Sequence, residues 1–408
     1  MSDTTLEFHE LSFLYEGDHV LVGRPGADSY AVLPLDGAKL LEQMVSGSSS
    51  LDAAAWYAAT YGESVDIASF VETIRGLGFV RDSSDDQETV AAEPVRLQRF
   101  SRLLFAPAAF LVYGLVFVAW LITIVRAPAL APNPRHVFFT RSLVLVQLLI
   151  LFGQIPCLFL HELFHVLAGR RLGLSSRVGL GNRLWFIVVE TRMPNLLSVP
   201  RRQRYLPFLV GMLADILIVS TLGLLAYGLH DGGKVEQVIA AVALAMAFPV
   251  CVRFAYQFLL FLQTDIYFVI TTALGCYDLH AASRALLLNR VWRLLRHPER
   301  VRDSEAWTPR DRQVARWYAP LFAVGAAVLL AVFTWGLVPV IKECINLISA
   351  AVGIGPTRVR FWDALLFVAV TVVQFGVYFY LLLRNRRRKP PASTAAPSAR
   401  PPLQPEYS

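Results

Sequence analysis

Positions 161–165 hold the side chains that a hydrolytic metal site requires, in the order H-E-L-F-H. Residues four apart share one face of a helix, so His161 and His165 can direct both imidazoles at a single ion. Zinc is the metal that such a pair binds in H-E-x-x-H helices, and it lowers the pKa of a bound water toward 7. Glu162 lies beside the pair and can take the proton of that water. The pattern predicts a zinc-dependent hydrolytic centre with Glu162 as general base and acid.

The apolar surroundings of this motif distinguish a functional site from a chance match on a packed helix. Ionisable side chains inside a membrane helix are costly, so an unexplained cluster of them indicates function. Arg170 and Arg171 follow the motif and mark a membrane interface. His161 precedes Arg170 by nine residues, which is about 13 Å along a helix. The predicted site therefore lies within the hydrocarbon layer, nearer its cytoplasmic face.

A third zinc ligand must come from another segment, because a hydrolytic zinc ion has three protein ligands and one open position. Intramembrane carboxylates are the candidates: Asp265, Asp215 and, in a loop, Glu190. Asp265 stands at the end of the fourth predicted span, and topology returns that end to the depth of His161. This matching depth favours Asp265. Each carboxylate has the alternative role of a structural hydrogen bond to a neighbouring helix.

The motif on a membrane helix, with an aspartate about a hundred residues later, resembles the site-2 protease family of intramembrane zinc metalloproteases. The similarity covers about residues 140–285. Thr264-Asp265-x-Tyr-Phe, followed by L-G-C-Y-D-L at 274–279, resembles the peptide-maturation branch of that family, although the usual glycine after the aspartate is missing. The family's Gly-Pro-x-x-Asn element corresponds to 211–215. The resemblance implies peptide-bond hydrolysis in or beside the membrane, with Asp265 as third ligand and Asp215 as alternative ligand or polar support.

Composition sets the frame for this site. Of the 408 residues, 55% are hydrophobic and only 17% are charged, and the mean hydropathy is +0.49. A soluble domain usually carries about 25% charged residues. We therefore expect a mainly α polytopic membrane protein, which excludes a cytosolic enzyme, a secreted disulfide scaffold and a disordered hub. The four cysteines form no CxxC pair and are expected to be small apolar core residues.

Six apolar segments reach the length needed to span a bilayer. The long stretch 236–276 must break, and Pro249 and the point after Phe261 are the candidate positions. Six spans put both termini on one side, and the basic run 384–389 marks that side as the cytoplasmic face of a bacterial-type cytoplasmic membrane. The predicted spans are 103–126, 140–168, 206–229, 236–262, 318–341 and 361–383.

The first 80 residues predict a small α+β domain of winged-helix type. Short apolar runs near 12–15, 19–22 and 30–33 are typical of strands, and Gly17 and Pro25-Gly26 separate them. Helices are expected over 35–45, from a cap at Ser50 or Asp52 to Thr60, and over 67–77 after a cap at Asp66. A linker at 81–102 joins this domain to the transmembrane domain at 103–383, and a disordered basic and Pro-rich tail follows at 384–408.

The N-terminal domain resembles the PqqD-like domains, which bind leader peptides of ribosomally made peptides as an added strand. The resemblance rests on the short strands, on Leu35-Asp36-Gly37 opening a helix, and on L-G-F-V at 77–80. A generic regulatory or docking domain is the alternative. DNA binding is disfavoured, because residues 1–90 contain few cations and no cluster of them. The cations in this part are Arg24, Lys39, Arg75 and Arg81.

The segment 178–200 predicts two short strands, V-G-L-G at 178–181 and L-W-F-I-V-V-E at 184–190, too short to span. In the family such a segment resembles a hairpin beside the active site, where a strand edge could hold an unfolded substrate. The alternative is an interfacial loop without a role in substrate binding.

We expect an intramembrane zinc endopeptidase that acts in the maturation of a ribosomally made peptide. Its expected partners are a peptide or membrane-protein substrate and the lipid bilayer. No nucleic-acid partner is expected. One alternative is a protease that cleaves a membrane-tethered anti-sigma or signalling protein. A second alternative is a non-enzymatic metal-binding component of peptide transport or immunity.

Overall fold

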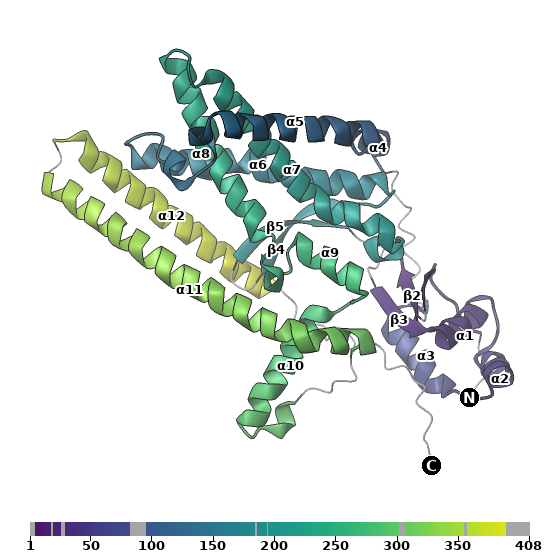
Figure 1. Cartoon of the computed structure of the whole chain (residues 1–408). Helices are drawn as coiled ribbons and strands as arrows, with labels where there is room; N and C mark the ends of the chain where they lie inside the picture. The colour runs from purple at the N-terminus through teal and green to yellow at the C-terminus, as the bar shows by residue number, and fades with distance from the viewer. Residues whose placement is uncertain are drawn as a thin grey trace.

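The computed structural model describes residues 5–17, 19–25, 29–81, 95–183, 186–193, 195–301, 307–354 and 357–388. Within this part the chain has six helices that are long and apolar enough to cross a membrane. A small three-stranded sheet lies near the N-terminus (Figure 1). The predicted fold class, a polytopic helical protein with a small α+β domain, is confirmed. The start of the predicted disordered tail at 384 was wrong, because α12 continues to Arg388; the tail beyond Arg388 and most of the predicted linker lie outside the described residues.

Each predicted span overlaps one of the six helices, with shifted ends. The fifth begins well before 318, because Thr308 caps the helix there: its hydroxyl accepts a hydrogen bond from the Asp311 amide at 3.1 Å. The spans are α5 (Pro107–Arg126), α6 (Leu143–Arg171), α7 (Arg201–Leu229), α8 (Lys234–Tyr256), Pro309–Ala331 within α11 (Pro309–Ile354) and Val359–Arg384 within α12 (Val359–Arg388).

The stretch 236–276 breaks after Tyr256, between the two candidate positions, and Pro249 lies inside α8 without ending it. A 3₁₀ turn at Leu260–Leu262 follows, and the short helix α9 (Asp265–Leu274) then begins. Gln263 has a left-handed backbone with φ of 53°, so it continues neither the 3₁₀ turn nor α8. Asp265 is therefore the first residue of a new helix, and the expectation that it ends the fourth span was wrong.

The N-terminal domain is an antiparallel sheet packed against three helices. The strands β1 (Ser12–Glu16), β2 (His19–Arg24) and β3 (Ser29–Pro34) lie in the order β1-β2-β3. The helices are α1 (Leu35–Val45), α2 (Ser50–Tyr61) and α3 (Ile67–Gly76). One core joins both layers and includes Val20, Leu40 and Phe70.

The helix caps of this domain were predicted only in part. Asp66 caps α3, since its carboxylate accepts from the Ser69 amide at 3.1 Å. The cap of α2 is Ser49, whose hydroxyl accepts from the Asp52 amide, and neither Ser50 nor Asp52. Ser49 has the extended backbone that a capping residue requires, whereas Ser50 is already helical.

Shorter elements complete the chain. The strands β4 (Arg177–Arg183) and β5 (Phe186–Arg192) pair antiparallel, which confirms the two strands predicted in this segment. The helix α4 (Gln98–Leu104) starts inside the predicted linker, and α10 (Leu279–Leu294) follows α9. Further 3₁₀ turns lie at Pro128–Leu130, Pro134–Val137, Leu196–Ser198 and Pro298–Arg300.

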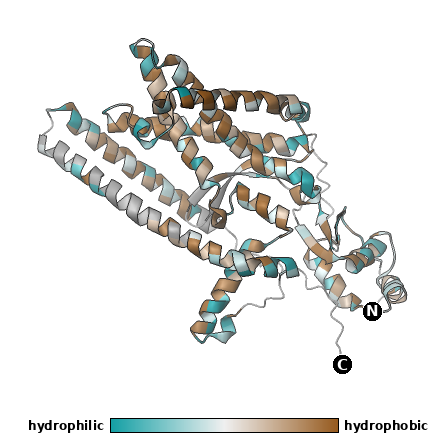
Figure 2. Ribbon diagram, viewed as in Figure 1, coloured by the Kyte–Doolittle hydropathy of each residue, from teal (hydrophilic) through white to brown (hydrophobic). Residues whose placement is uncertain are grey.

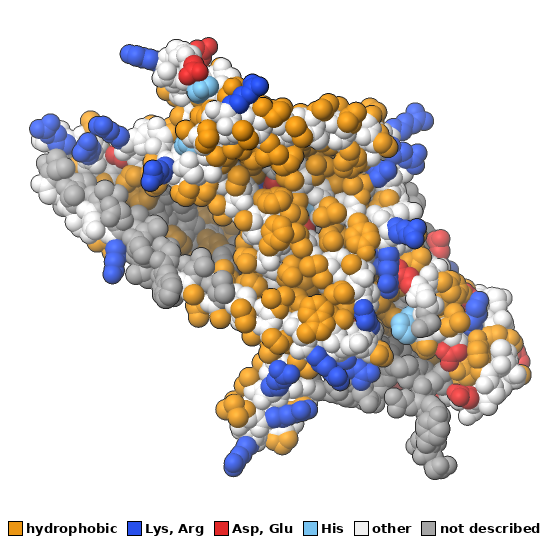
Figure 3. All heavy atoms as spheres, viewed as in Figure 1, with side chains coloured by type: hydrophobic (Ala, Val, Ile, Leu, Met, Phe, Trp, Pro, Cys, Tyr) orange, Lys and Arg blue, Asp and Glu red, His pale blue; other side chains and the backbone are white. Residues whose placement is uncertain are grey.

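The helices α6, α7 and α8 pack together at the centre, with α5 against α7 and α12 against α6. Figure 2 shows that hydrophobic residues predominate along the spans that it colours. Figure 3 shows a broad apolar surface across them, with Lys and Arg side chains toward its borders. Half of the α7 span is buried, but only 6% of the α5 span. The central position of α7 matters for the site, because α7 packs directly against α6, which carries His161, Glu162 and His165.

Candidate metal centre

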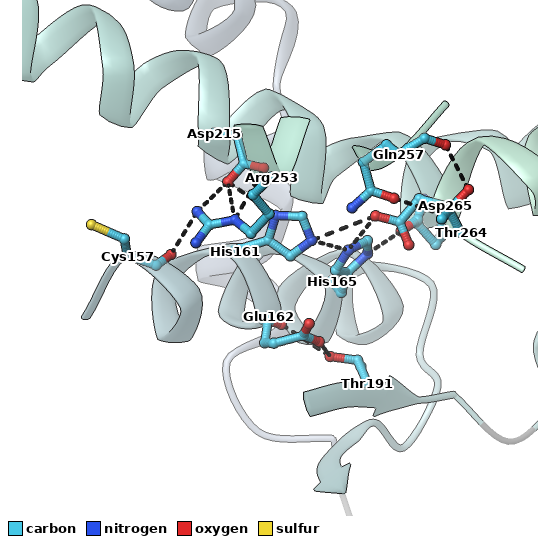
Figure 4. Close-up of polar contacts among 11 residues, drawn as sticks. Cys157, His161, Glu162, His165, Thr191, Asp215, Arg253, Gln257, Thr264 and Asp265 are labelled. Carbon is cyan, nitrogen blue, oxygen red and sulfur yellow. Dashed lines mark hydrogen bonds and ion pairs between the residues drawn. The ribbon is translucent and has the colours of Figure 1, made fainter. Parts of the chain in front are cut away.

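Three potential metal ligands from two helices meet in the structure: His161 and His165 from α6 and Asp265 from the start of α9 (Figure 4). The two imidazole Nε2 atoms are 3.3 Å apart. Asp265 Oδ2 lies 3.5 Å from Nε2 of His161 and 3.3 Å from Nε2 of His165. The structure thus brings together the two predicted histidines and the favoured third ligand.

These separations fit one small ion. A tetrahedral ion with bonds of about 2.0–2.1 Å holds neighbouring ligand atoms about 3.3–3.4 Å apart. Asp265 Oδ2 is buried and has no hydrogen-bond partner among the described residues. Since an unsatisfied buried oxygen is costly, a cation between the three atoms would account for it. One carboxylate and two imidazoles are also a donor set that zinc accepts.

The space for an ion exists because position 211 is glycine. A Cβ built on Gly211 of α7 would lie 2.2 Å from Nε2 of His165 and 2.5 Å from Nε2 of His161. These are distances at which any side-chain atom would collide with both rings. The backbone of α7 therefore closes one side of the cluster while leaving an atom-sized gap beside both nitrogens.

Both rings are oriented by contacts on their far nitrogens. His165 Nδ1 donates to the Pro207 carbonyl at 2.7 Å, which leaves the lone pair on Nε2, toward the cluster. His161 Nδ1 lies 3.1 Å from Oδ1 of Asp215. Such outer contacts fix the tautomer and orientation of metal-ligating histidines.

Asp215, the predicted alternative ligand or polar support, lies outside the three-atom cluster. Its side chain is fully buried, and it faces the edge of His161 opposite Asp265 (Figure 4). Arg253 of α8 donates to it from Nη2 at 2.5 Å and from Nε at 3.1 Å. This geometry suits polar support of His161. The Glu190 side chain, the further candidate, lies outside the described residues.

Glu162 is buried and lies off the face of the two histidines, as the 100° step between adjacent helical residues requires. Its Oε2 accepts a hydrogen bond of 2.8 Å from the hydroxyl of Thr191 on β5. Figure 4 shows the two side chains pointing toward one another. The hairpin predicted near the site therefore contacts the proposed base directly.

One cavity of about 500 Å³ connects these groups. Glu162, both histidines and Asp265 line it, together with polar residues that sequence reasoning did not single out. Gln257 holds Asp265 here: the Gln257 side-chain oxygen accepts from the Asp265 amide at 3.1 Å, at the start of α9, where a helix leaves its first amides without an intrahelical partner. The additional polar lining residues include Thr191, Arg192, Arg253, Tyr256, Gln257 and Thr264.

Arg253 is the residue that a different sequence signal could have found. It is a lone cation within the apolar run of α8, and a buried charge in a span requires a partner. Asp215, the lone acid within the predicted third span, is that partner. Thr191 carries no comparable signal, since a threonine in a strand is ordinary.

Comparison of the chain with protein-family models, with curated proteins and with solved structures gave no match.

Proposed function

We propose that this protein is an intramembrane zinc endopeptidase of the site-2 protease type. One observation carries the proposal: two imidazoles and a carboxylate lie 3.3–3.5 Å apart among membrane-spanning helices, with a further carboxylate on the same cavity wall. Polar side chains among membrane-spanning helices are energetically costly, so their presence there indicates a function. A metal-dependent hydrolase uses all four of them.

His161, His165 and Asp265 would hold the zinc ion, and bound zinc supplies Lewis-acid activation of water and of the substrate carbonyl. Glu162 accepts a proton from the attacking water at a carboxylate oxygen, while the hydroxide adds to the carbonyl carbon of the scissile bond. The C–N bond then breaks, and Glu162 delivers the proton to the departing nitrogen. The products are a carboxylic acid and an amine, and the carboxylate of Glu162 is regenerated.

The substrate we propose is a precursor peptide presented by the N-terminal domain, in line with the resemblance to PqqD-like domains. The domain contacts the segment that follows β5, since Ser12 and Ser198 hydroxyls lie 3.1 Å apart and the Tyr30 hydroxyl donates to Asn195 at 3.1 Å. An extended peptide beside β5 could reach the cavity from there. Both termini would face the cytoplasm of a bacterial-type cytoplasmic membrane, because the arginine-rich segments lie on the same side of the spans as the termini.

The test of the enzyme is Glu162→Gln, which removes the base but no proposed ligand. Purified protein in detergent, loaded with zinc, is incubated with casein, an extended chain that needs no unfolding, and new termini are identified by mass spectrometry. We expect roughly one zinc per chain in both proteins and cleavage by the wild type alone. Casein cleavage by the Glu162→Gln variant at the wild-type level would contradict the proposal. A wild-type protein that binds no zinc or cleaves no casein would also contradict it.

The proposed role of the N-terminal domain needs a separate experiment. A host that expresses the chain with its candidate precursor peptide is compared with one that expresses a variant lacking residues 1–80. We expect precursor cleavage to be lost in the variant while casein cleavage persists. Equal precursor cleavage by the two proteins would remove the delivery role and leave the peptidase.

A further inference from the structure

Thr191 is the polar contact of Glu162 within the part of the chain that the structure describes. Its hydroxyl lies 2.8 Å from Glu162 Oε2 and 3.2 Å from the Glu162 carbonyl oxygen. A hydroxyl has one proton, and the shorter distance assigns it to the carboxylate. The Glu162 residue is 5% exposed, so this donor matters for an ionised group in an apolar setting.

The hydrogen bond also determines how the carboxylate is turned. Thr191 engages Oε2, which leaves Oε1 as the oxygen that can take a proton from water in the cavity. The glutamate side chain has three rotatable bonds, whereas threonine on a strand has a restricted first torsion. The rigid partner therefore selects among the orientations of the flexible one.

The strand that carries Thr191 is itself a wall of the cavity. Val189 and Met193, two residues to either side, line the same space, and β5 packs on α6. A peptide lying in the cavity would press on the strand that orients the base. The position of Glu162 is thus coupled to the element closest to the substrate.

We propose that Thr191 is a positioning residue that orients the Glu162 carboxylate for proton transfer through its hydroxyl. The inference rests on the proposed peptidase function, in which Glu162 is the base. It assigns to the hairpin a role in the chemical step in addition to any role in holding substrate.

The kinetic test compares Thr191→Val, which keeps the shape but loses the hydroxyl, with Thr191→Ser, which keeps the hydroxyl. We expect kcat on casein to fall about tenfold to a hundredfold in Thr191→Val with KM unchanged, and Thr191→Ser to recover most of it. Thr191→Ala, which removes the same hydroxyl, is measured in parallel in case the valine variant does not fold. Thr123→Val is the matched control, because Thr123 is a buried threonine of α5 that bonds within its own helix.

A second readout needs neither zinc nor activity. Amide hydrogen exchange over residues 186–193 is measured in the metal-free protein for Thr191→Val, Glu162→Met and the double variant. If the two side chains act through one hydrogen bond, each single change speeds exchange by about the same factor and the double variant adds nothing further. Multiplied effects in the double variant would mean that the two residues act independently.

The outcomes separate the two proposals. Wild-type kcat in Thr191→Val and Thr191→Ala, with Glu162→Gln inactive, would overturn the role of Thr191 and leave the peptidase intact. An active Glu162→Gln would overturn the peptidase mechanism itself. Loss of zinc from Thr191→Val would also overturn the inference, since a positioning residue for the base leaves the proposed ligands in place.

Discussion

Asp215 and His161 lie with Oδ1 and Nδ1 3.1 Å apart, on the side of the ring that faces away from His165 and Asp265 (Figure 4). Asp215 is fully buried, and Arg253 balances its charge. Asp215 lies on α7 and Arg253 on α8, so two neighbouring helices together orient the His161 ring on α6. This support is neutral overall, which limits the cost of burying a carboxylate among apolar spans.

Replacing Asp215 with Asn should weaken zinc binding without abolishing it. Asparagine has nearly the size of aspartate, but its uncharged amide lowers the basicity of the His161 imidazole. The amide also allows His161 to adopt the other tautomer. Loss of such an outer carboxylate typically costs tenfold to a hundredfold in metal affinity, and we expect about that here. Competition with a chelating dye measures it, and Asp265→Ala, which removes a proposed ligand, should lose far more. Equal losses in the two variants would make Asp215 a ligand.

The partner of Asp215 supplies a second comparison. Arg253→Met leaves a buried carboxylate unpaired and should destabilise the protein by about 3–5 kcal/mol. The double variant Asp215→Asn/Arg253→Met removes both charges and should recover much of that loss. Thermal unfolding in one detergent compares the two single variants and the double variant with the wild type. A double variant as unstable as the sum of the single variants would argue against a coupled pair.

Gly211→Ala should prevent zinc binding. The new methyl group would lie 2.2 and 2.5 Å from the two Nε2 atoms, in the space proposed for the ion, and both rings are held from behind. Zinc content of purified protein is expected to fall from roughly one per chain to near zero. Gly228→Ala on the same helix is the matched control, because a Cβ there meets nothing within 4 Å. Wild-type affinity in Gly211→Ala would place the ion elsewhere.

The parts of the site that sequence predicted are those that local spacing determines. His161 and His165 share a face because they are four apart on one helix, and this holds whatever the rest of the chain does. Asp265 needed an argument from topology and a resemblance. The argument named a residue that the structure brings beside both imidazoles, although the helix it assumed ends at Tyr256 and Asp265 begins α9.

The contacts that sequence did not predict are those between distant segments. The packing of the β4–β5 hairpin on α6 brings Thr191 into contact with Glu162, and no periodic pattern in the sequence indicates this contact. Asp215 and Arg253 stand 38 residues apart in separate apolar runs, and the packing of α7 on α8 pairs them. Helix and strand positions followed from apolar periodicity and turn residues, whereas cap and span ends depended on single hydrogen bonds such as those of Ser49 and Thr308.

Glu16→Gln should loosen the N-terminal domain from the membrane-spanning part. The Glu16 side chain is 8% exposed and binds Arg201 at 2.6 Å and Arg204 at 2.8 Å. The Tyr277 hydroxyl donates to it at 2.7 Å, and burial together with this hydrogen bond raises the pKa of Tyr277, so the phenol stays a donor. Without the charge, both guanidinium groups lose their ion pair, and we expect faster amide exchange at 12–16, 196–198 and 275–278.

The control for this experiment lies on the same domain. Glu72 is an exposed acidic residue of α3, and exposed charges contribute little to stability. Glu72→Gln should therefore leave exchange at the three segments unchanged. If Glu16→Gln also leaves it unchanged, the domain is held by its other contacts, such as those of Ser12 and Tyr30 with the segment after β5.

Asp363→Ala should destabilise α6 at its N-terminus, far from the proposed metal site. The Asp363 carboxylate, from α12, accepts from the Ser142 hydroxyl at 2.5 Å and from the Leu143 amide at 2.9 Å, so it caps α6 across the helix interface. Loss of a cap costs about 1 kcal/mol, and we expect a lower unfolding temperature with zinc content unchanged. Asp231→Ala, at a side chain that is 89% exposed, should change neither. Should Asp363→Ala unfold like the wild type, α12 is attached to α6 by Gln147 and its partners Thr371 and Gln374 instead.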